Sequence, residues 1–118
     1  MNLATHWNGE EFGRANGSEM SVGFHVLVAR AAATRPLCAG TIIGSGTVSN
    51  AEYGQVGFSC VNERRGIEIV DHSRALTPFV SFDDSIHTEA GNTEGNVLFG
   101  SAQQRVVQAQ LHQARDRD

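Results

Sequence analysis

The sequence predicts an α+β fold that is made mainly of β-strands and contains one main helix. Three patterns lead to this fold class. Residues 3–7 alternate between apolar and polar side chains and precede the turn pair Asn8-Gly9. Residues 22–34 carry apolar side chains at helical spacing. Near the end of the chain, two apolar segments at residues 85–89 and 96–100 flank a glycine-rich turn, which predicts a second hairpin.

The composition describes an ordinary globular domain. A chain of 118 residues can bury one modest core, and 40% hydrophobic with 19% charged residues argues against disorder. The net charge of −4 disfavours nucleic acid, because phosphate binding needs clustered Lys and Arg. No apolar stretch reaches the ~20 residues that cross a bilayer, and the N-terminus lacks the pattern of a signal peptide. We therefore expect a cytoplasmic protein without nucleic-acid or membrane partners.

The first hairpin is expected to continue through Phe12, because Asn and Gly adopt the positive φ angles of a two-residue turn. Ser21 is a suitable N-cap for the helix at residues 22–34. Pro36 ends this helix or lies just beyond it. The apolar side chains of the helix share one face by their spacing: Phe24, Leu27, Val28 and Ala31.

Residues 40–50 read GTIIGSGTVSN and form the most informative segment of the chain. Its β-branched residues predict a buried strand, and the glycines after them allow the backbone to turn or to approach a ligand closely. The strand would end at Gly46 and Thr47, which offer a backbone amide and a hydroxyl. A glycine bulge is the structural alternative, whereas the lone Gly44-Ser45-Gly46 pattern is weak evidence for a nucleotide site.

The segment at residues 63–70 fits two alternatives. Ile67 and Ile69 favour a strand that begins near Arg65, but the same residues can be drawn as a helical turn. Residues 108–118 form a polar tail that we expect to fray. One domain at residues 1–107 followed by this tail is the expected organisation.

Cysteines and histidines indicate no local metal site or disulfide framework. Cys38 and Cys60 are too few for such a framework and are expected to be reduced. The five histidines show no spacing typical of metal ligands. Glu10-Glu11 and Asp83-Asp84 are adjacent pairs, and neighbouring residues of a strand point to opposite faces. We expect these four acids at the surface or in turns.

Several segments resemble, in order, the C-terminal part of the fumarylacetoacetate hydrolase family. Ser45-Gly46-Thr47 is similar to the family's Gly-Thr pair at a strand end, and Trp7 to Arg14 resembles its hairpin before the helix. Thr77-Pro78-Phe79 with Asp83 to His87 is similar to the strand pair that closes these enzymes. The resemblance reaches about Val107. It implies a mixed β-sheet folded into a roll or sandwich.

The resemblance also implies a reaction and roles for three residues. Family enzymes hydrolyse a carbon–carbon bond in a diketo acid, or catalyse a related hydration or decarboxylation, with a divalent cation, usually Mg²⁺ or Ca²⁺. Gly46 and Thr47 would bind the carboxylate or oxo group of a small oxo acid, and Glu63 would take part in general acid and base chemistry. An ion pair of Glu63 with Arg64 and Arg65 is the alternative.

The chain departs from the family pattern at two points. It has nine arginines and no lysine, whereas the family's catalytic core uses a lysine. The family's Glu-x-Glu cation ligands lie upstream of the region that is matched, and no metal ligand is recognised in this chain. We therefore expect an incomplete catalytic site that is inactive by itself. The alternative is a non-catalytic binding or assembly module, which keeps the β-fold and forms a homodimer.

Overall fold

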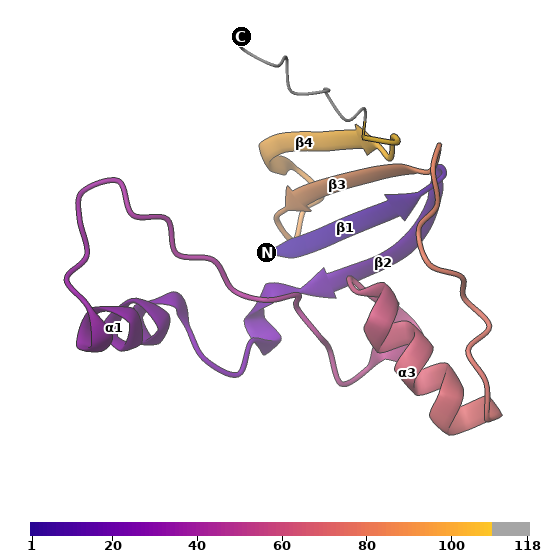
Figure 1. The fold of residues 1–118 in the computed structure, drawn as a ribbon, viewed down its shortest axis with the longest axis horizontal. Coiled ribbons are helices and arrows are strands. Elements are labelled where there is room, and N and C mark those ends of the chain that lie inside the picture. The colour runs from indigo at the N-terminus through magenta and orange to yellow at the C-terminus, as the bar shows by residue number, and fades with distance from the viewer. Residues whose placement is uncertain (110–118) are drawn as a thin grey trace, which may run out of the picture.

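Residues 1–109 are described in a computed structural model, which has an α+β fold built on one four-stranded sheet (Figure 1). The strands lie in the order β2-β1-β3-β4, and every neighbouring pair is antiparallel. The α+β class is confirmed. The prediction of a mixed sheet is wrong for residues 1–109, because their sheet contains no parallel pair. The strands are β1 (Asn2–Trp7), β2 (Glu10–Asn16), β3 (Ser85–Gly91) and β4 (Val97–Arg105).

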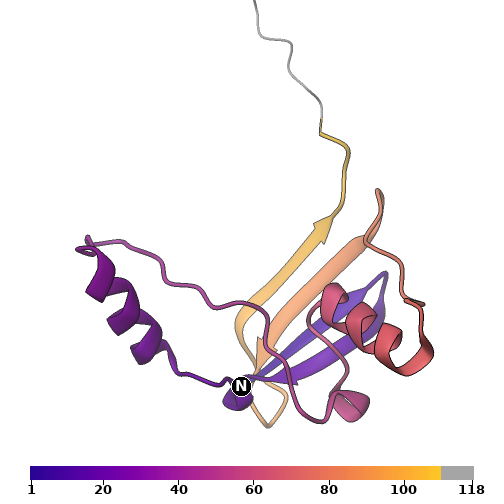
Figure 2. The same ribbon diagram turned by 60° about the horizontal axis from the view of Figure 1, so that its bottom comes forward.

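Two helices of similar length accompany the sheet, instead of one main helix. They are α1 (Phe24–Thr34) and α3 (Val61–His72), and the shorter elements are η1 (Gly17–Glu19) and α2 (Tyr53–Val56). Helix α3 lies beside β2, whereas α1 stands apart from the sheet in both views (Figures 1 and 2). No helix within residues 1–109 is long and apolar enough to span a membrane.

The first hairpin is confirmed. Asn8 and Gly9 form its turn with φ angles of 53° and 86°, as the pair predicts. The Asn8 side chain also reaches the start of β3, because its Nδ2 donates to Asp84 Oδ1 at 2.7 Å and its Oδ1 accepts from the Ser85 amide at 2.8 Å. The turn is therefore joined to a segment that lies 76 residues away in the sequence.

The buried apolar side chains of the described chain lie on the first hairpin: Ala4 of β1, and Phe12 and Ala15 of β2. Phe12 is buried and contacts the Trp7 ring edge-to-face, with 5.7 Å between the ring centres. Next to it, Gly13 pairs with Gly57 in an isolated antiparallel bridge. A Cβ on Gly13 would overlap the backbone of Phe58. Glycine is needed at this point because two backbones approach each other closely.

Helix α3 resolves the alternative that the sequence left open at residues 63–70. The segment is helical, and the left-handed Ser73, with a φ angle of 60°, ends it. The strand interpretation is wrong. In a strand, Ile67 and Ile69 would share one face, but in the helix they point in different directions. Ile67 lines a cavity against the sheet, whereas Ile69 is exposed.

Helix α1 confirms the predicted helix with a later start. Gly23 occupies the N-cap position in place of Ser21, and the helix ends at Thr34 before Arg35 and Pro36. None of its residues is buried, and Phe24 and Val28 are largely exposed. The predicted apolar face is present, but within residues 1–109 the sheet does not cover it.

The strand predicted within residues 40–50 is wrong, because residues 41–50 have no regular secondary structure. Ile42 is 93% exposed and therefore does not pack in the described part of the chain as a residue of a buried strand would. A local turn replaces the strand: the Thr41 amide and hydroxyl both donate to the Cys38 carbonyl, at 3.1 and 2.8 Å. β-Propensity depends on a pleated surface to pack against, and within residues 1–109 no strand pairs with this segment.

The second hairpin is confirmed and is longer than predicted. Strands β3 and β4 extend beyond residues 85–89 and 96–100, and Asn92 fixes the turn between them by accepting hydrogen bonds at Oδ1 from the amides of Glu94 and Asn96. Of the predicted polar tail, residues 108 and 109 are irregular. Residues 110–118 lie outside the described part of the chain.

Candidate functional site

The loop that carries Gly46 and Thr47 borders a cavity of about 390 Å³. Both residues are exposed. The opposite wall comes from η1, the segment after it and α1. The loop contributes Gly44, Ser45, Gly46, Thr47, Val48 and Ser49, and the opposite wall contributes Glu19, Met20, Ser21, Val22 and Leu27. Both predicted binding residues line this cavity, in a segment that is a loop and not a strand end.

One end of this loop is firmly attached to the sheet. The buried Asn50 accepts the Asn16 amide at Oδ1 over 2.6 Å, and its Nδ2 donates to the Asn16 carbonyl at 3.0 Å. Its side chain thus replaces the neighbouring strand that the end of β2 would otherwise pair with. The Ser59 hydroxyl donates to the Val48 carbonyl at 2.7 Å. These bonds fix the backbone directly after Thr47.

Glu63 lies in the first turn of α3 and does not line the cavity of Gly46 and Thr47. The two segments meet through the hydrogen bond between Ser59 and Val48, which links the loop to the entrance of α3. The Glu63 Oε2 atom is buried and has no hydrogen-bond partner within residues 1–109. A buried carboxylate oxygen normally has a donor. This oxygen is therefore available to a water molecule or to a proton donor that is brought to it.

The structure does not show the alternative predicted for Glu63, which is an ion pair with Arg64 and Arg65. Arg64 pairs with Glu68 instead, with Nε donating to Oε1 at 3.3 Å. Arg65 donates to the Thr77 carbonyl, and its guanidinium carbon lies 4.1 Å from the centre of the Phe79 ring. Both arginines thus hold α3 against neighbouring segments and leave Glu63 without either of them.

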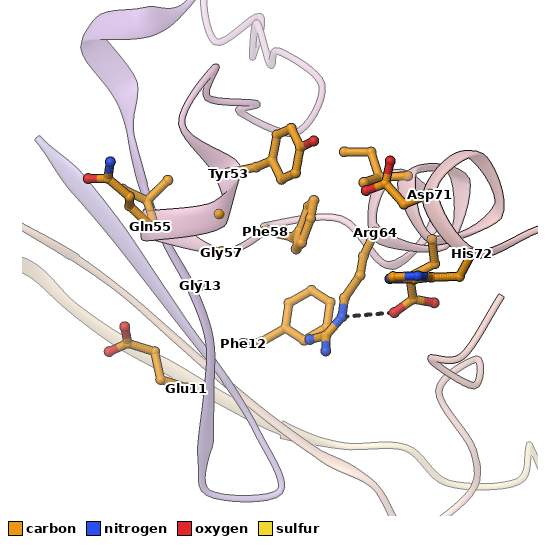
Figure 3. Close-up of a pocket in the computed structure, with 14 residues that line it drawn as sticks. Glu11, Phe12, Gly13, Tyr53, Gln55, Gly57, Phe58, Arg64, Asp71 and His72 are labelled. Carbon is orange, nitrogen blue, oxygen red and sulfur yellow. Dashed lines mark hydrogen bonds and ion pairs between the residues drawn. The ribbon is translucent and has the colours of Figure 1, made fainter.

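Two further cavities lie between β2 and α3, and the sequence did not predict them. One has a volume of about 490 Å³ and is lined by both aromatic and charged residues (Figure 3). Figure 3 shows Arg64 extended beside Phe12, and its guanidinium carbon lies 5.2 Å from the Phe12 ring centre and 6.0 Å from that of Phe58. The second cavity, of about 710 Å³, shares Arg64, Phe12 and Glu68 with the first.

Glu68 is the most strongly perturbed acid of this region. Its pKa is lowered from 4.5 to about 2, mainly because the Thr77 hydroxyl and amide donate hydrogen bonds to the carboxylate. The Leu76 amide and Arg64 contribute in the same direction, whereas desolvation opposes them. The i,i+4 spacing of Arg64 and Glu68 is the one signal that could have revealed the pair, and it requires the helix to be recognised first.

The described residues do not fit the cation site that the resemblance implies. Within residues 1–109 no three His, Cys, Asp or Glu side chains are grouped so that they could hold a metal ion. Glu10 and Glu11 pair with different residues of β1, Trp7 and His6 respectively. Asp84 is used structurally, because its pKa is lowered by hydrogen bonds from the Ser81 amide and the Asn8 side chain.

The two hairpins, the helices and the glycine-rich loop together form one α+β domain. The family described as "Fumarylacetoacetate (FAA) hydrolase C-terminal" matches residues 1–107. The chain therefore belongs to this family. A search among curated proteins found no match to the chain.

Proposed function

We propose that this chain provides the substrate-binding part of a fumarylacetoacetate hydrolase-like enzyme. In the complete enzyme the reaction is hydrolysis of a carbon–carbon bond in a small diketo acid, or a related hydration or decarboxylation. The observation that carries the proposal is the placement of Gly46 and Thr47 on one wall of a cavity, in a chain that the family matches over residues 1–107.

Gly46 and Thr47 would hold a carboxylate or oxo group of the substrate. A backbone amide and a hydroxyl are both hydrogen-bond donors, and a pair of donors aimed at one oxygen stabilises negative charge there. The attachment of Val48 and Asn50 to the rest of the protein supports this role, because a donor pair is effective only when its backbone is held in place.

Glu63 would act as the general acid or base of the reaction. Its unpartnered Oε2 can accept a proton from water, and its position at the start of α3 places it on the segment that Ser59 joins to the binding loop. The divalent cation of the family, Mg²⁺ or Ca²⁺, would be held by residues other than those described here, and the chain alone would be catalytically silent.

Binding can be tested separately from turnover with pyruvate, a minimal oxo acid. In two-dimensional NMR spectra of the 118-residue chain, we expect pyruvate to shift the amide signals of Gly46 and Thr47, and we expect Thr47→Ala to weaken this response about tenfold, which equals the loss of one charged hydrogen bond. Thr93→Ala is the matched control, because Thr93 is exposed in the turn between β3 and β4. Equal pyruvate-induced shifts in the unmodified chain, Thr47→Ala and Thr93→Ala would refute the binding role.

Turnover is tested with Mg²⁺ and an acylpyruvate, whose enol absorbance falls on cleavage. We expect no loss of absorbance above the uncatalysed rate with this chain alone. Steady turnover that Glu63→Gln abolishes would show that the chain is active by itself, and it would contradict the proposed incompleteness of the site while supporting the role of Glu63.

A non-catalytic assembly module is the second candidate, and exposed apolar surface favours it. Strand β4 is at the edge of the sheet and exposes Leu98 and Phe99, and α1 exposes Phe24 and Val28. An exposed edge strand with apolar side chains pairs readily with another copy. Light scattering decides this point: a homodimer that binds no pyruvate supports the module, and a monomer that binds pyruvate supports the enzyme part.

A further inference from the structure

A row of four polar side chains crosses the whole sheet at one level. His6 of β1 lies opposite Glu11 of β2 on one side and His87 of β3 on the other, and His87 lies opposite Gln103 of β4. Residues that are directly opposite in an antiparallel sheet share a face. The row therefore places two imidazoles side by side, with an oxygen-bearing side chain at each end.

The two imidazoles are close enough to share one metal ion. Their ring centres are 5.6 Å apart, and the ring planes are inclined by 33°. Two imidazoles that bind one zinc ion tetrahedrally, with N–Zn distances of about 2.0–2.1 Å, have ring centres roughly 5 Å apart. The observed separation of the two ring centres is therefore close to that of a ligand pair.

One nitrogen of the pair lacks a partner, and the Nε2 atom of each ring has a carboxylate nearby. His6 Nδ1 is buried and makes no hydrogen bond within residues 1–109. His6 Nε2 lies 4.0 Å from Glu11 Oε2, and His87 Nε2 lies 3.8 Å from Glu89 Oε2. Ligating histidines usually present their second nitrogen to a carboxylate, which orients the ring. Arg14 pairs with Glu11 and holds that carboxylate in place.

The space above the pair admits an ion with its remaining ligands. A cavity of about 260 Å³ is lined by His6, Gly9, Ser85, His87 and Gln103. Zinc sites that are not purely structural commonly keep water at one or more positions. Since no three His, Cys, Asp or Glu side chains of the described chain are already grouped for a metal, two imidazoles and water molecules are the ligands that this site can offer.

We propose that His6 and His87 form a binding site for a divalent transition-metal ion on the face of the sheet. The ligands are His6 Nδ1 and one nitrogen of His87, and Glu11 and Glu89 orient the two rings. Imidazole ligands favour Zn²⁺, Ni²⁺ and Cu²⁺ over the oxygen-preferring Mg²⁺ and Ca²⁺. The metals that this site selects thus differ from the Mg²⁺ or Ca²⁺ of the proposed hydrolase reaction.

Titration calorimetry with ZnCl₂ on the 118-residue chain tests this site. We expect one Zn²⁺ per chain, and an affinity that falls about tenfold or more in His6→Gln and in His87→Gln, because each variant loses one of two protein ligands. His25→Gln and His72→Gln are matched controls on α1 and α3 and should bind as the unmodified chain does. Zn²⁺ affinity that is unchanged in the double variant His6→Gln/His87→Gln would overturn the proposal.

NMR spectra keep the test valid if a variant folds poorly. In the unmodified chain, Zn²⁺ should shift the ring signals of His6 and His87, while those of His25 and His72 stay unchanged and MgCl₂ at the same concentration has no effect. Zn²⁺ that shifts only other histidines would overturn the proposal without any substitution. Because pyruvate is absent from these samples, the result is independent of the proposed enzyme function.

Discussion

Glu68 and Thr77 are joined by two hydrogen bonds that tie α3 to the segment leading into β3. The Thr77 hydroxyl donates to Glu68 Oε1 at 2.5 Å, and the Thr77 amide donates to Oε2 at 2.8 Å. The Leu76 amide adds a third bond to Oε2 at 2.7 Å. One carboxylate, with its side chain only 12% exposed, thus organises a stretch that has no regular secondary structure.

This relationship predicts a specific sensitivity to acid. The folded-state pKa of Glu68, about 2, lies below its ordinary value of 4.5, so the unfolded chain binds more protons between these values. The stabilisation is complete above the ordinary pKa and is lost as the pH falls toward 2. Thr77→Val should raise the pKa of Glu68 and lower the free energy of unfolding at neutral pH.

Urea unfolding of Thr77→Val and of the unmodified chain, measured at a series of pH values, checks this prediction. The free energies of unfolding of the two proteins should become more similar as the pH falls from the ordinary pKa of Glu68 toward its folded-state pKa. Once Glu68 is protonated, the hydrogen bonds from Thr77 no longer stabilise a carboxylate. Thr93→Val serves as the control with no such trend. A difference that is independent of pH would show that Thr77 acts by packing alone.

Gly13 should tolerate no side chain. A Cβ at this position would overlap the Phe58 backbone, and backbone cannot move aside as a flexible side chain can. We expect Gly13→Ala to lower the free energy of unfolding by about 1–3 kcal/mol, as overpacking does elsewhere. Gly54→Ala is the matched control, since nothing lies within 4 Å of its added Cβ. Equal midpoints in thermal unfolding would contradict this prediction.

Gly66 should behave in the opposite way. It lies inside α3, is exposed, and would meet nothing within 4 Å of an added Cβ. Alanine restricts the unfolded chain and has the higher helix propensity. We therefore expect Gly66→Ala to raise the free energy of unfolding by about 0.5–1 kcal/mol, measured by urea unfolding. A loss of stability would mean that α3 packs more tightly at this residue than the structure indicates.

Arg64 should not be replaceable by lysine. Its planar guanidinium lies near both the Phe12 and Phe58 rings and also pairs with Glu68. Lysine keeps the charge but lacks the planar group that stacks on aromatic rings. We expect Arg64→Lys to cost about 0.5–1 kcal/mol of stability, whereas Arg74→Lys, at an exposed position after α3, should have no measurable effect.

The elements that the sequence predicted correctly are those whose signals are local. Asn8-Gly9 defines its turn through two positive φ angles, and the β3–β4 hairpin follows from alternation around a turn that Asn92 stabilises. Helix α1 follows from spacing alone. These features depend on residues that are close in the sequence, so that no knowledge of the tertiary packing was needed.

The errors arose where tertiary context decides. Residues 41–50 have the composition of a strand, but no strand of the described chain lies next to them, and Ile42 is left in solvent. Helix α3 was ambiguous because Ile67 and Ile69 suggest alternation, while the contact of Arg64 with Phe12 and the bond of Glu68 to Thr77 favour the helix. Such contacts join segments that the sequence does not place together.

The same distinction applies to the candidate site. The binding role of Gly46 and Thr47 stays a prediction, but their place beside a cavity could be anticipated because a glycine next to a hydroxyl has a recognisable local pattern. The row of His6 and His87 could not, because the two residues lie on strands whose pairing is known only from the folded sheet. The ligand character of a histidine shows in its spacing only when both ligands are on one element.

Helix α1 should unfold locally while the sheet stays folded. Since none of its residues is buried and it stands apart from the sheet, unwinding it exposes little additional apolar surface. Its amide hydrogens should therefore exchange with deuterium long before those of β1, which is paired on both sides. In this chain the helix would open as an independent unit, whereas the central strands would exchange only on global unfolding.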